Sequence, residues 1–365
     1  MSERLNKLLI ELTDKDGSDL HIKSGQPPIM RIRGDLVRSE TPALSDDETQ
    51  ELLFGILNKA RRDHFNSFKE VDLSYTVPNV ARFRVNMFWQ MRKPGAVFRA
   101  IPFKVRTCDQ LGLPPAAKKL SMLPRGLILV TGPTGSGKST SLAGMINEIN
   151  ITKKSHIMTV EDPIEYVHAD KQSIVNQREL STDTHSFADA LKHVMRQNPD
   201  VILVGEMRDL ETIQLAITAA ETGHLVMSTL HTVDAAQTMD RMIDVFPPEQ
   251  QAQIRTQLSV TIQGVLSQTL IPSRDGKGRV AAFEVMVATP AIRTLIREGK
   301  THQLYLDIQT GADLGMQTLD GHLLQLVREG KIDFDHAIAK SSNAVDFQKR
   351  AASQGLTGGS SVAAY

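Results

Sequence analysis

Residues 132–140 read Gly-Pro-Thr-Gly-Ser-Gly-Lys-Ser-Thr and directly follow the apolar run of residues 127–130, Leu-Ile-Leu-Val. This is a complete GxxxxGK[ST] motif in the strand-to-helix setting of a phosphate-binding loop. A chance glycine-rich turn with a surface lysine does not explain Lys-Ser-Thr after a buried strand. The predicted ATP-binding residues are the nine of this stretch: Gly132, Pro133, Thr134, Gly135, Ser136, Gly137, Lys138, Ser139 and Thr140.

Each residue type in this loop has a physical reason to be there. Glycines let the backbone curl, so that several N–H groups and the start of the following helix point at one spot. Lys138 is expected to reach the β and γ phosphates, and the Ser139 hydroxyl to bind Mg²⁺. The loop therefore predicts a nucleotide-binding α/β domain that uses ATP and Mg²⁺.

Composition limits the remaining possibilities. The 365 residues suggest two or three domains, and 42 basic residues balance 42 acidic ones, so no overall positive field favours nucleic acid as a partner. The single cysteine, Cys108, excludes an internal disulfide and a multi-cysteine zinc site, which fits a reducing compartment. Because neither a signal-peptide pattern nor a run of about 18 apolar residues occurs, a cytoplasmic protein is expected.

The first hundred residues lack a strand-helix alternation. Short extended runs are expected at residues 19–23, 29–33 and 35–38, before one helix that begins after a capping box of Ser45 and Glu48 and extends to residue 60. Three more strands follow. In residues 80–90, apolar and polar side chains alternate, which predicts one core face and one face that presents arginines.

From residue 125 onward, strands and helices alternate, which predicts a parallel sheet with helices on both faces. Beyond residue 247 the chain is expected to be mainly helical, interrupted by a hairpin of residues 267–271 and 279–287. Residues 351–365, rich in glycine, serine and alanine, are predicted to be disordered. The predicted strands are 127–131, 156–160, 201–205 and 225–229, and the predicted helices start at residue 138 or span 186–197 and 210–221.

Acidic residues follow two of the predicted strands, at the sheet edge where open α/β sheets place their sites. Glu206 follows the strand of residues 201–205 and is expected to hold Mg²⁺ or orient the attacking water. Glu161 and Glu165 follow the strand of residues 156–160 and are candidates for the general base. Spacing alone does not decide which acid acts, and acids that merely complement a helix dipole are the plainer alternative.

Three more residues are candidates for the catalytic set. His231 lies after the strand of residues 225–229, where it is expected either to sense the γ-phosphate or to contact a neighbouring subunit. Arg84 and Arg99 belong to the N-terminal region, yet a lone phosphate loop lacks the arginine that stabilises transition-state charge. A ring of subunits would supply it in trans; solvated arginines on an exposed sheet face are the alternative.

Four ordered motifs resemble the Walker A, Asp box, Walker B and His box of the secretion and type IV pilus ATPase superfamily. They are residues 132–140, 160–165, 204–209, and 218–224 with 229–232. Residues 18–21 (Ser-Asp-Leu-His), 81–86, 291–298 (Ala-Ile-Arg-Thr-Leu-Ile-Arg-Glu) and 314–318 narrow the resemblance to the twitching-motility branch, the PilT-type pilus retraction ATPases. The resemblance covers about residues 1–340.

This resemblance implies a homo-hexamer that hydrolyses ATP to retract type IV pili, bound peripherally at the cytoplasmic face of the inner membrane. Its expected partners are an inner-membrane pilus platform protein and an accessory retraction ATPase paralogue. It implies a PAS-like α+β domain over residues 1–103, a linker over 104–115, and a RecA-like P-loop ATPase domain with a helical C-terminal portion over 116–350. The disordered tail of residues 351–365 completes the chain.

Other functions remain as alternatives. Residues beyond about 339 look more like the accessory PilU-type paralogue, while pilus assembly and type II secretion ATPases usually add a larger N-terminal region and a four-cysteine zinc element. A nucleic-acid motor lacks support in the neutral charge, and a non-hydrolysing scaffold would have a spoiled site. The helix of residues 291–298 carries Arg293 and Arg297 four residues apart, which suggests an acidic partner and a role in force transmission.

Overall fold

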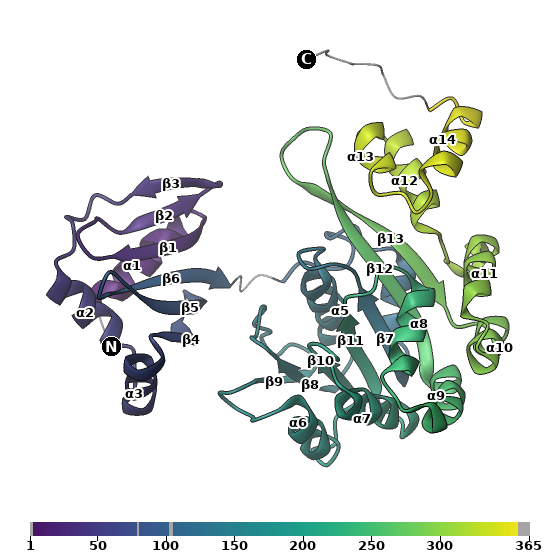
Figure 1. Ribbon diagram of the computed structural model, residues 1–365, viewed down its shortest axis with the longest axis horizontal. Coiled ribbons are helices and arrows are strands. Elements are labelled where there is room, and N and C mark those ends of the chain that lie inside the picture. Colours follow the sequence, from purple (N-terminus) through teal and green to yellow (C-terminus); the bar gives the residue numbers. More distant parts are fainter. Residues whose placement is uncertain (1–2, 79, 102–104, 357–365) are drawn as a thin grey trace. The chain divides into compact units, whose positions relative to one another are not determined.

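The structure, a computed structural model, describes residues 3–78, 80–101 and 105–356, and the chain forms two compact units (Figure 1). The N-terminal unit comprises Met1–Lys104 with Glu165–Val167, and the larger unit comprises Val105–Ile164 and His168–Tyr365. Cys108 and Leu113, within the segment expected to be a linker, are buried in the core of the larger unit. From residue 105 the chain therefore packs onto that unit, because its apolar side chains find a core there.

The N-terminal unit is a six-stranded antiparallel sheet in the order β3-β2-β1-β6-β5-β4, with three helices packed against it. Its elements are α1 (Glu3–Asp14), β1 (Gly17–Lys23), β2 (Ile29–Ile32), β3 (Asp35–Arg38), α2 (Asp46–Phe54), α3 (Lys59–Phe68), β4 (Glu70–Val77), β5 (Ala81–Gln90) and β6 (Lys93–Ile101). Strand β5 alternates as expected: Phe83 and Val85 are buried in the core, while Arg82 and Arg84 lie on the opposite face.

The helices of this unit differ from the expectation in two places. Helix α1 was not predicted, although its leucines recur at helical spacing and are buried. Helix α2 begins at the predicted capping box of Ser45 and Glu48 but ends at Phe54. The single helix expected to reach residue 60 was therefore wrong, because Gly55 ends α2 and Asn58 caps the separate helix α3.

The larger unit contains a seven-stranded sheet in the order β13-β12-β7-β11-β10-β8-β9, parallel except for the edge strand β13. Its strands are β7 (Gly126–Thr131), β8 (His156–Glu161), β9 (Ile174–Glu179), β10 (Val201–Val204), β11 (Leu225–Leu230), β12 (Ile262–Pro272) and β13 (Arg279–Val287). Its helices include α4 (Pro115–Ser121), α5 (Lys138–Thr152), α6 (Phe187–Val194), α7 (Leu210–Glu221), α8 (Ala235–Asp244), α9 (Pro248–Thr261), α10 (Pro290–Glu298) and α11 (Leu304–Thr310). The predicted α/β class with a parallel sheet is thereby confirmed.

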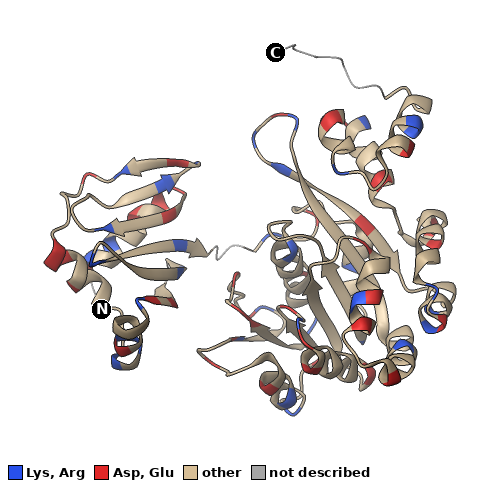
Figure 2. Cartoon of the chain, in the orientation of Figure 1, with Lys and Arg blue, Asp and Glu red and all other residues tan. Residues whose placement is uncertain are grey.

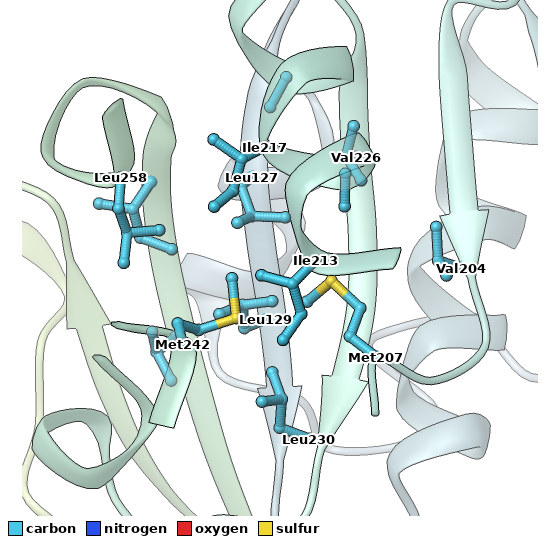
Figure 3. Packing of buried hydrophobic residues seen from close by; sticks show 14 of the residues in the cluster. Leu127, Leu129, Val204, Met207, Ile213, Ile217, Val226, Leu230, Met242 and Leu258 are labelled. Carbon is cyan, nitrogen blue, oxygen red and sulfur yellow. The ribbon is translucent and has the colours of Figure 1, made fainter. Parts of the chain in front are cut away.

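Helices cover both faces of this sheet because its central strands are apolar on both sides. Leu127 and Leu129 of β7 belong to a core formed with α6 to α11, whereas Ile128 and Val130 belong to a second core with α4 and α5. Figure 3 shows side chains of the first core converging between the helices and the sheet. Strands β7, β10 and β11 contain no charged residue, and Figure 2 shows the positions of charged residues of both signs on other segments of the chain.

Three larger differences from the expectation occur in the larger unit, beside shifts of one to three residues at other element ends. Strand β9 was not predicted, since its sequence is mostly polar and it lies at the sheet edge. Strand β12 of the predicted hairpin begins at Ile262 instead of residue 267 and runs parallel to β7. Helix α14 (Ala344–Ser353) extends past residue 351, where disorder was expected, because Phe347 and Ala351 are buried in a C-terminal core.

That C-terminal core is formed by three helices packed on the β12–β13 hairpin. The helices are α12 (Leu319–Arg328), α13 (Phe334–Ile338) and α14, and the short 3₁₀ turns η1 (Thr301–Gln303) and η2 (Ala312–Leu314) precede them. Ile271 of β12 and Ala282 of β13 contribute to it. Residues 357–365 of the predicted tail lie outside the described residues. In the part of the chain that is described, each helix is too short or too polar to cross a membrane.

Candidate active site

The loop between β7 and α5 adopts a conformation that its glycines make possible. Gly132, Gly135 and Gly137 have φ angles of 141°, 77° and 90°, a region that side chains disfavour. A Cβ atom at Gly132 would lie 2.2 Å from the carbonyl oxygen of Gln268. Glycine is therefore required at position 132 for two reasons: its φ angle disfavours a side chain, and β12 leaves no room for a Cβ atom.

The start of α5 offers groups that an anion could bind. Its N-cap residue is Gly137, and no side chain of the described residues caps the helix, so the N–H groups of the first turn face outward from the helix end. Lys138 is 9% exposed, and its Nζ donates hydrogen bonds to the carbonyls of Gly132 (2.8 Å) and Pro133 (3.1 Å). Ser136 Oγ is buried and has no hydrogen-bond partner among the described residues. An ammonium, a helix start and an unpaired hydroxyl fit a nucleotide phosphate.

Strand β12, which pairs with β7 on the side opposite β11, forms hydrogen bonds with the phosphate loop. Gln268 Nε2 donates to the Ser136 carbonyl (2.7 Å), and Gln268 Oε1 accepts from Ser141 Oγ (2.6 Å). Thr131 Oγ1 donates to Ser267 Oγ at 2.9 Å. Sequence reasoning missed Gln268, because a residue 132 positions beyond Ser136 carries no local signal of this contact.

Glu206 emerges after β10, at the carboxyl edge of the sheet. Ser228 Oγ donates to the Val204 carbonyl and Thr229 Oγ1 to the Gly205 carbonyl, both at 2.7 Å, which fixes the backbone before Glu206. The Glu206 side chain is 19% exposed; it forms an ion pair with Arg208 (2.7 Å) and lies 2.8 Å from His231 Nε2. Two of the predicted residues, Glu206 and His231, thus lie in direct contact.

These partners set the charge of Glu206. Burial alone would raise the pKa of this carboxyl, but the hydrogen bond and charge of Arg208, followed by His231, hold the pKa below its usual range. Arg208 was not singled out from the sequence, although it lies within the strand-end motif. Glu206 is therefore ionised at neutral pH, as an acid that holds a metal or a metal-bound water must be.

The two acids at the end of β8 differ in position, because Glu161 is the last residue of the strand and Glu165 lies in the loop that follows. Glu161 is half-buried beside the strand end of β10, with its Cα 3.2 Å from where a Cβ of Gly205 would lie. Its Oε1 accepts hydrogen bonds from Thr159 Oγ1 (2.6 Å) and Gln177 Nε2 (3.1 Å). Glu165 is exposed in the loop after β8. The structure therefore brings Glu161 to the strand ends that carry Glu206.

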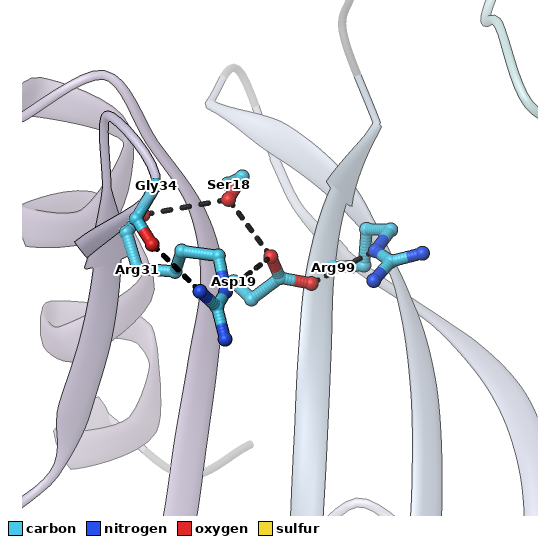
Figure 4. A network of polar contacts seen from close by, with 5 residues as sticks. All are labelled: Ser18, Asp19, Arg31, Gly34 and Arg99. Carbon is cyan, nitrogen blue, oxygen red and sulfur yellow. Dashed lines mark hydrogen bonds and ion pairs between the residues drawn. The ribbon is translucent and has the colours of Figure 1, made fainter. Parts of the chain in front are cut away.

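In the N-terminal unit, Arg84 and Arg99 face each other directly on β5 and β6, and Asp19 of β1 faces Arg99 on its other side. Asp19 is 4% exposed; it pairs with Arg99 at 2.8 Å and with Arg31 at 3.8 Å, and accepts from Ser18 Oγ (Figure 4). Burial alone would raise the pKa of Asp19, but the hydrogen bonds from Arg99 and Ser18 hold it below its usual range.

These contacts leave a positive row on the outer face of this sheet. The side chain of Arg99 is 69% exposed despite its ion pair, and Arg84 is exposed as well. Like charges directly opposite each other on neighbouring strands are destabilising. Such an arrangement favours an anion that binds both guanidinium groups.

Helix α10, residues 290–298, does not present both arginines to a partner. Arg293 donates to the carbonyls of Ser259 (2.8 Å) and Val260 (2.7 Å) and to Gln263 Oε1 (3.0 Å). It therefore satisfies carbonyls at the end of α9. The expectation that Arg293 awaits an acidic partner was wrong, because backbone carbonyls already take up its donors.

The chain is similar to known proteins over most of its length. Residues 1–338 match the family described as Type II/IV secretion system protein. The chain is 54% identical to the Type IV pilus retractation ATPase PilT of Pseudomonas aeruginosa, over 92% of this chain and 98% of that protein. It is 41% identical to the Type IV pilus ATPase PilU of the same organism, over 94% and 90% of the two chains.

A solved structure of a pilus retraction motor is also similar to this chain. The crystal structure of the pilus retraction motor PilT with bound ADP superposes with a TM-score of 0.87 at 45% sequence identity, over 94% of this chain and 98% of that one. The fold expected from the motifs, with an N-terminal domain and a P-loop ATPase domain, is thereby confirmed. The chain belongs to the Type II/IV secretion system protein family and, within it, to the pilus retraction ATPases of the PilT type.

Proposed function

We propose that this chain is the motor that hydrolyses ATP to retract type IV pili in twitching motility. One observation carries the proposal: a chain that matches a retraction ATPase over nearly its full length also keeps an intact phosphate loop and a partly buried, ionised Glu206. A non-hydrolysing scaffold would not need either. The accessory PilU-type role is the second candidate, disfavoured by the lower identity to PilU.

Within the site, we propose that the nine loop residues 132–140 bind the phosphates and that Ser139 and Glu206 hold Mg²⁺. The donor set fits, because a hydroxyl and a carboxylate supply the hard oxygen ligands that Mg²⁺ prefers. Bound Mg²⁺ would neutralise charge on the β and γ phosphates. Lys138, which now donates to two loop carbonyls, would exchange them for phosphate oxygens.

The roles of the acids follow from their surroundings. A carboxylate with a lowered pKa is a weak proton acceptor, so Glu206 suits metal binding and water orientation better than general base catalysis. Glu161, which is oriented by Thr159 and Gln177, is our proposed general base, and the exposed Glu165 is the alternative. His231 contacts Glu206 and would report γ-phosphate loss through it.

We further propose that Arg84 and Arg99 act on the nucleotide of a neighbouring subunit in a homo-hexamer. They are exposed, mutually repulsive and only partly compensated by Asp19. Phosphate oxygens of a transition state would relieve that repulsion, and an arginine supplied in trans is a known way to stabilise such charge. Hydrolysis then depends on assembly, so the rate per subunit should rise with protein concentration.

In the cell, we propose a cytoplasmic motor held peripherally at the inner membrane by a pilus platform protein, in company with a PilU-type paralogue. Deleting the gene distinguishes the alternatives. Cells that keep pili but no longer twitch support retraction, whereas cells without pili would indicate an assembly ATPase. Motility that persists unless the paralogue is deleted as well would indicate the accessory role.

A further inference from the structure

Gln268 of β12 connects the two ends of the phosphate-loop turn. Its Nε2 donates to the Ser136 carbonyl before Gly137, and its Oε1 accepts from Ser141 in the first turn of α5, at 2.7 and 2.6 Å. The residue is only 5% exposed, and a Cβ at Gly137 would lie 2.8 Å from its Nε2. The amide therefore spans the turn that leads from Gly137 into Lys138.

The contact with Ser136 fixes the direction of a neighbouring N–H group. The peptide bond between Ser136 and Gly137 is planar and trans, so its C=O and N–H point in opposite directions. Because Gln268 holds the Ser136 carbonyl toward β12, the Gly137 N–H is directed away from β12. That N–H belongs to the set that a phosphate-binding loop directs at its anion.

Only an amide of this length suits both contacts. Methionine has nearly the same volume but can neither donate to Ser136 nor accept from Ser141. Glutamate could still accept from Ser141, but it would turn an oxygen toward the Ser136 carbonyl and add negative charge near the phosphates. The chemistry of the two contacts thus selects glutamine.

We propose that Gln268 is a positioning residue for the nucleotide: it holds the phosphate loop in the binding conformation before ATP arrives. It touches no reacting atom and acts through the Ser136–Gly137 peptide. A loop without this brace must be ordered when the nucleotide binds, and that entropy cost weakens affinity. The same cost applies to ground state and transition state, so KM should rise while kcat changes little.

The test compares three full-length variants by their Kd for a fluorescent ADP analogue, their KM and kcat for ATP, and their melting temperature without nucleotide. Gln268→Met should raise Kd and KM about tenfold, and Ser141→Ala, which removes one of the two bonds, about threefold. Gln317→Met is the matched control, since Gln317 also donates to a backbone carbonyl of this sheet, that of Phe283 at 3.1 Å. Its Kd should equal that of the unmodified chain.

An unchanged Kd in Gln268→Met would overturn the proposal, even if its melting temperature fell, because Gln268 would then only stabilise the fold. If Gln268→Met does not fold, Ser141→Ala decides. A raised Kd in that variant supports the positioning role, and a Kd equal to that of the control contradicts it.

Discussion

The phosphate loop of the larger unit and the arginine row of the N-terminal unit, Arg84 and Arg99, differ in how completely their polar groups are hydrogen-bonded or ion-paired within their own unit. Lys138 and Gln268 are buried and hydrogen-bonded to the loop itself. Arg84 and Arg99 are exposed and face each other as like charges. The loop groups are hydrogen-bonded within their own unit, whereas Asp19 compensates the arginine row only in part. We therefore propose that such a site binds a nucleotide by itself but needs an arginine from another subunit to hydrolyse it.

The largest effect is expected from Lys138→Ala, which tests whether the loop binds nucleotide by itself. Loss of the ammonium leaves the β-phosphate charge of ADP uncompensated, so affinity for ADP should fall by roughly a hundredfold or more. A fluorescent ADP titration measures it. Lys153→Ala is the control, because Lys153 at the other end of α5 also donates to carbonyls, those of Met122 and Leu123. Equal losses in both variants would show that helix stability, and not phosphate binding, is at stake.

Glu206→Gln is expected to have a smaller effect, and to lower kcat instead of nucleotide affinity. The amide keeps the volume but loses the charge, so ADP affinity should change little while kcat falls by about a hundredfold. Glu249→Gln serves as the matched comparison, since Glu249 is exposed in the first turn of α9 and has no part in the proposed site. A loss of ADP binding in Glu206→Gln as large as in Lys138→Ala would contradict the separate roles of the two residues.

The smallest effect concerns the free energy of unfolding, and it tests whether burial in the larger unit keeps the Glu284 carboxyl protonated. Glu284 of β13 is buried and accepts from the Ala235 N–H at 2.8 Å; burial raises its pKa to about 7. Since the folded state holds this proton more tightly than the unfolded state, stability is lost as pH rises from about 4.5 to 7.

Glu284→Gln should remove that loss. The free energy of unfolding of the variant, relative to the unmodified chain, should be higher at pH 8 than at pH 5 by roughly 2–3 kcal/mol. Urea denaturation at the two pH values measures it, and Glu51→Gln, on the exposed side of α2, controls for loss of one charge. The same difference at both pH values would mean that Glu284 is already ionised in the folded chain.

Local pattern was enough to predict the parts of the site that are close in sequence. The motif predicted the phosphate loop, and the apolar runs predicted the strands that bring Glu161 and Glu206 to one edge of the sheet. Gln268 escaped prediction because its partners are separated from it by more than 120 residues, and its contact depends on the parallel pairing of β12 with β7. Arg208 escaped because an arginine near a strand end is common.

Two missed elements, α1 and β9, and the misjudged role of Arg293 have separate causes. Helix α1 carries a clear leucine periodicity that indicates an amphipathic helix, so its signal was present. Strand β9 has no such signal, because an edge strand that buries little apolar surface reads as a loop. The role of Arg293 was unpredictable from charge spacing alone, since its carbonyl partners lie in another helix.

The central claim, that one subunit binds the nucleotide and the next supplies the arginines, is tested most directly by mixing two inactive variants. Lys138→Ala keeps Arg84 but cannot bind nucleotide, and Arg84→Ala binds nucleotide but lacks the arginine. In mixed rings of equal composition, about one interface in four combines an intact loop with an intact arginine. We predict that ATPase activity recovers to about a quarter of the unmodified rate. No recovery, in mixed rings verified to contain both variants, would contradict the account.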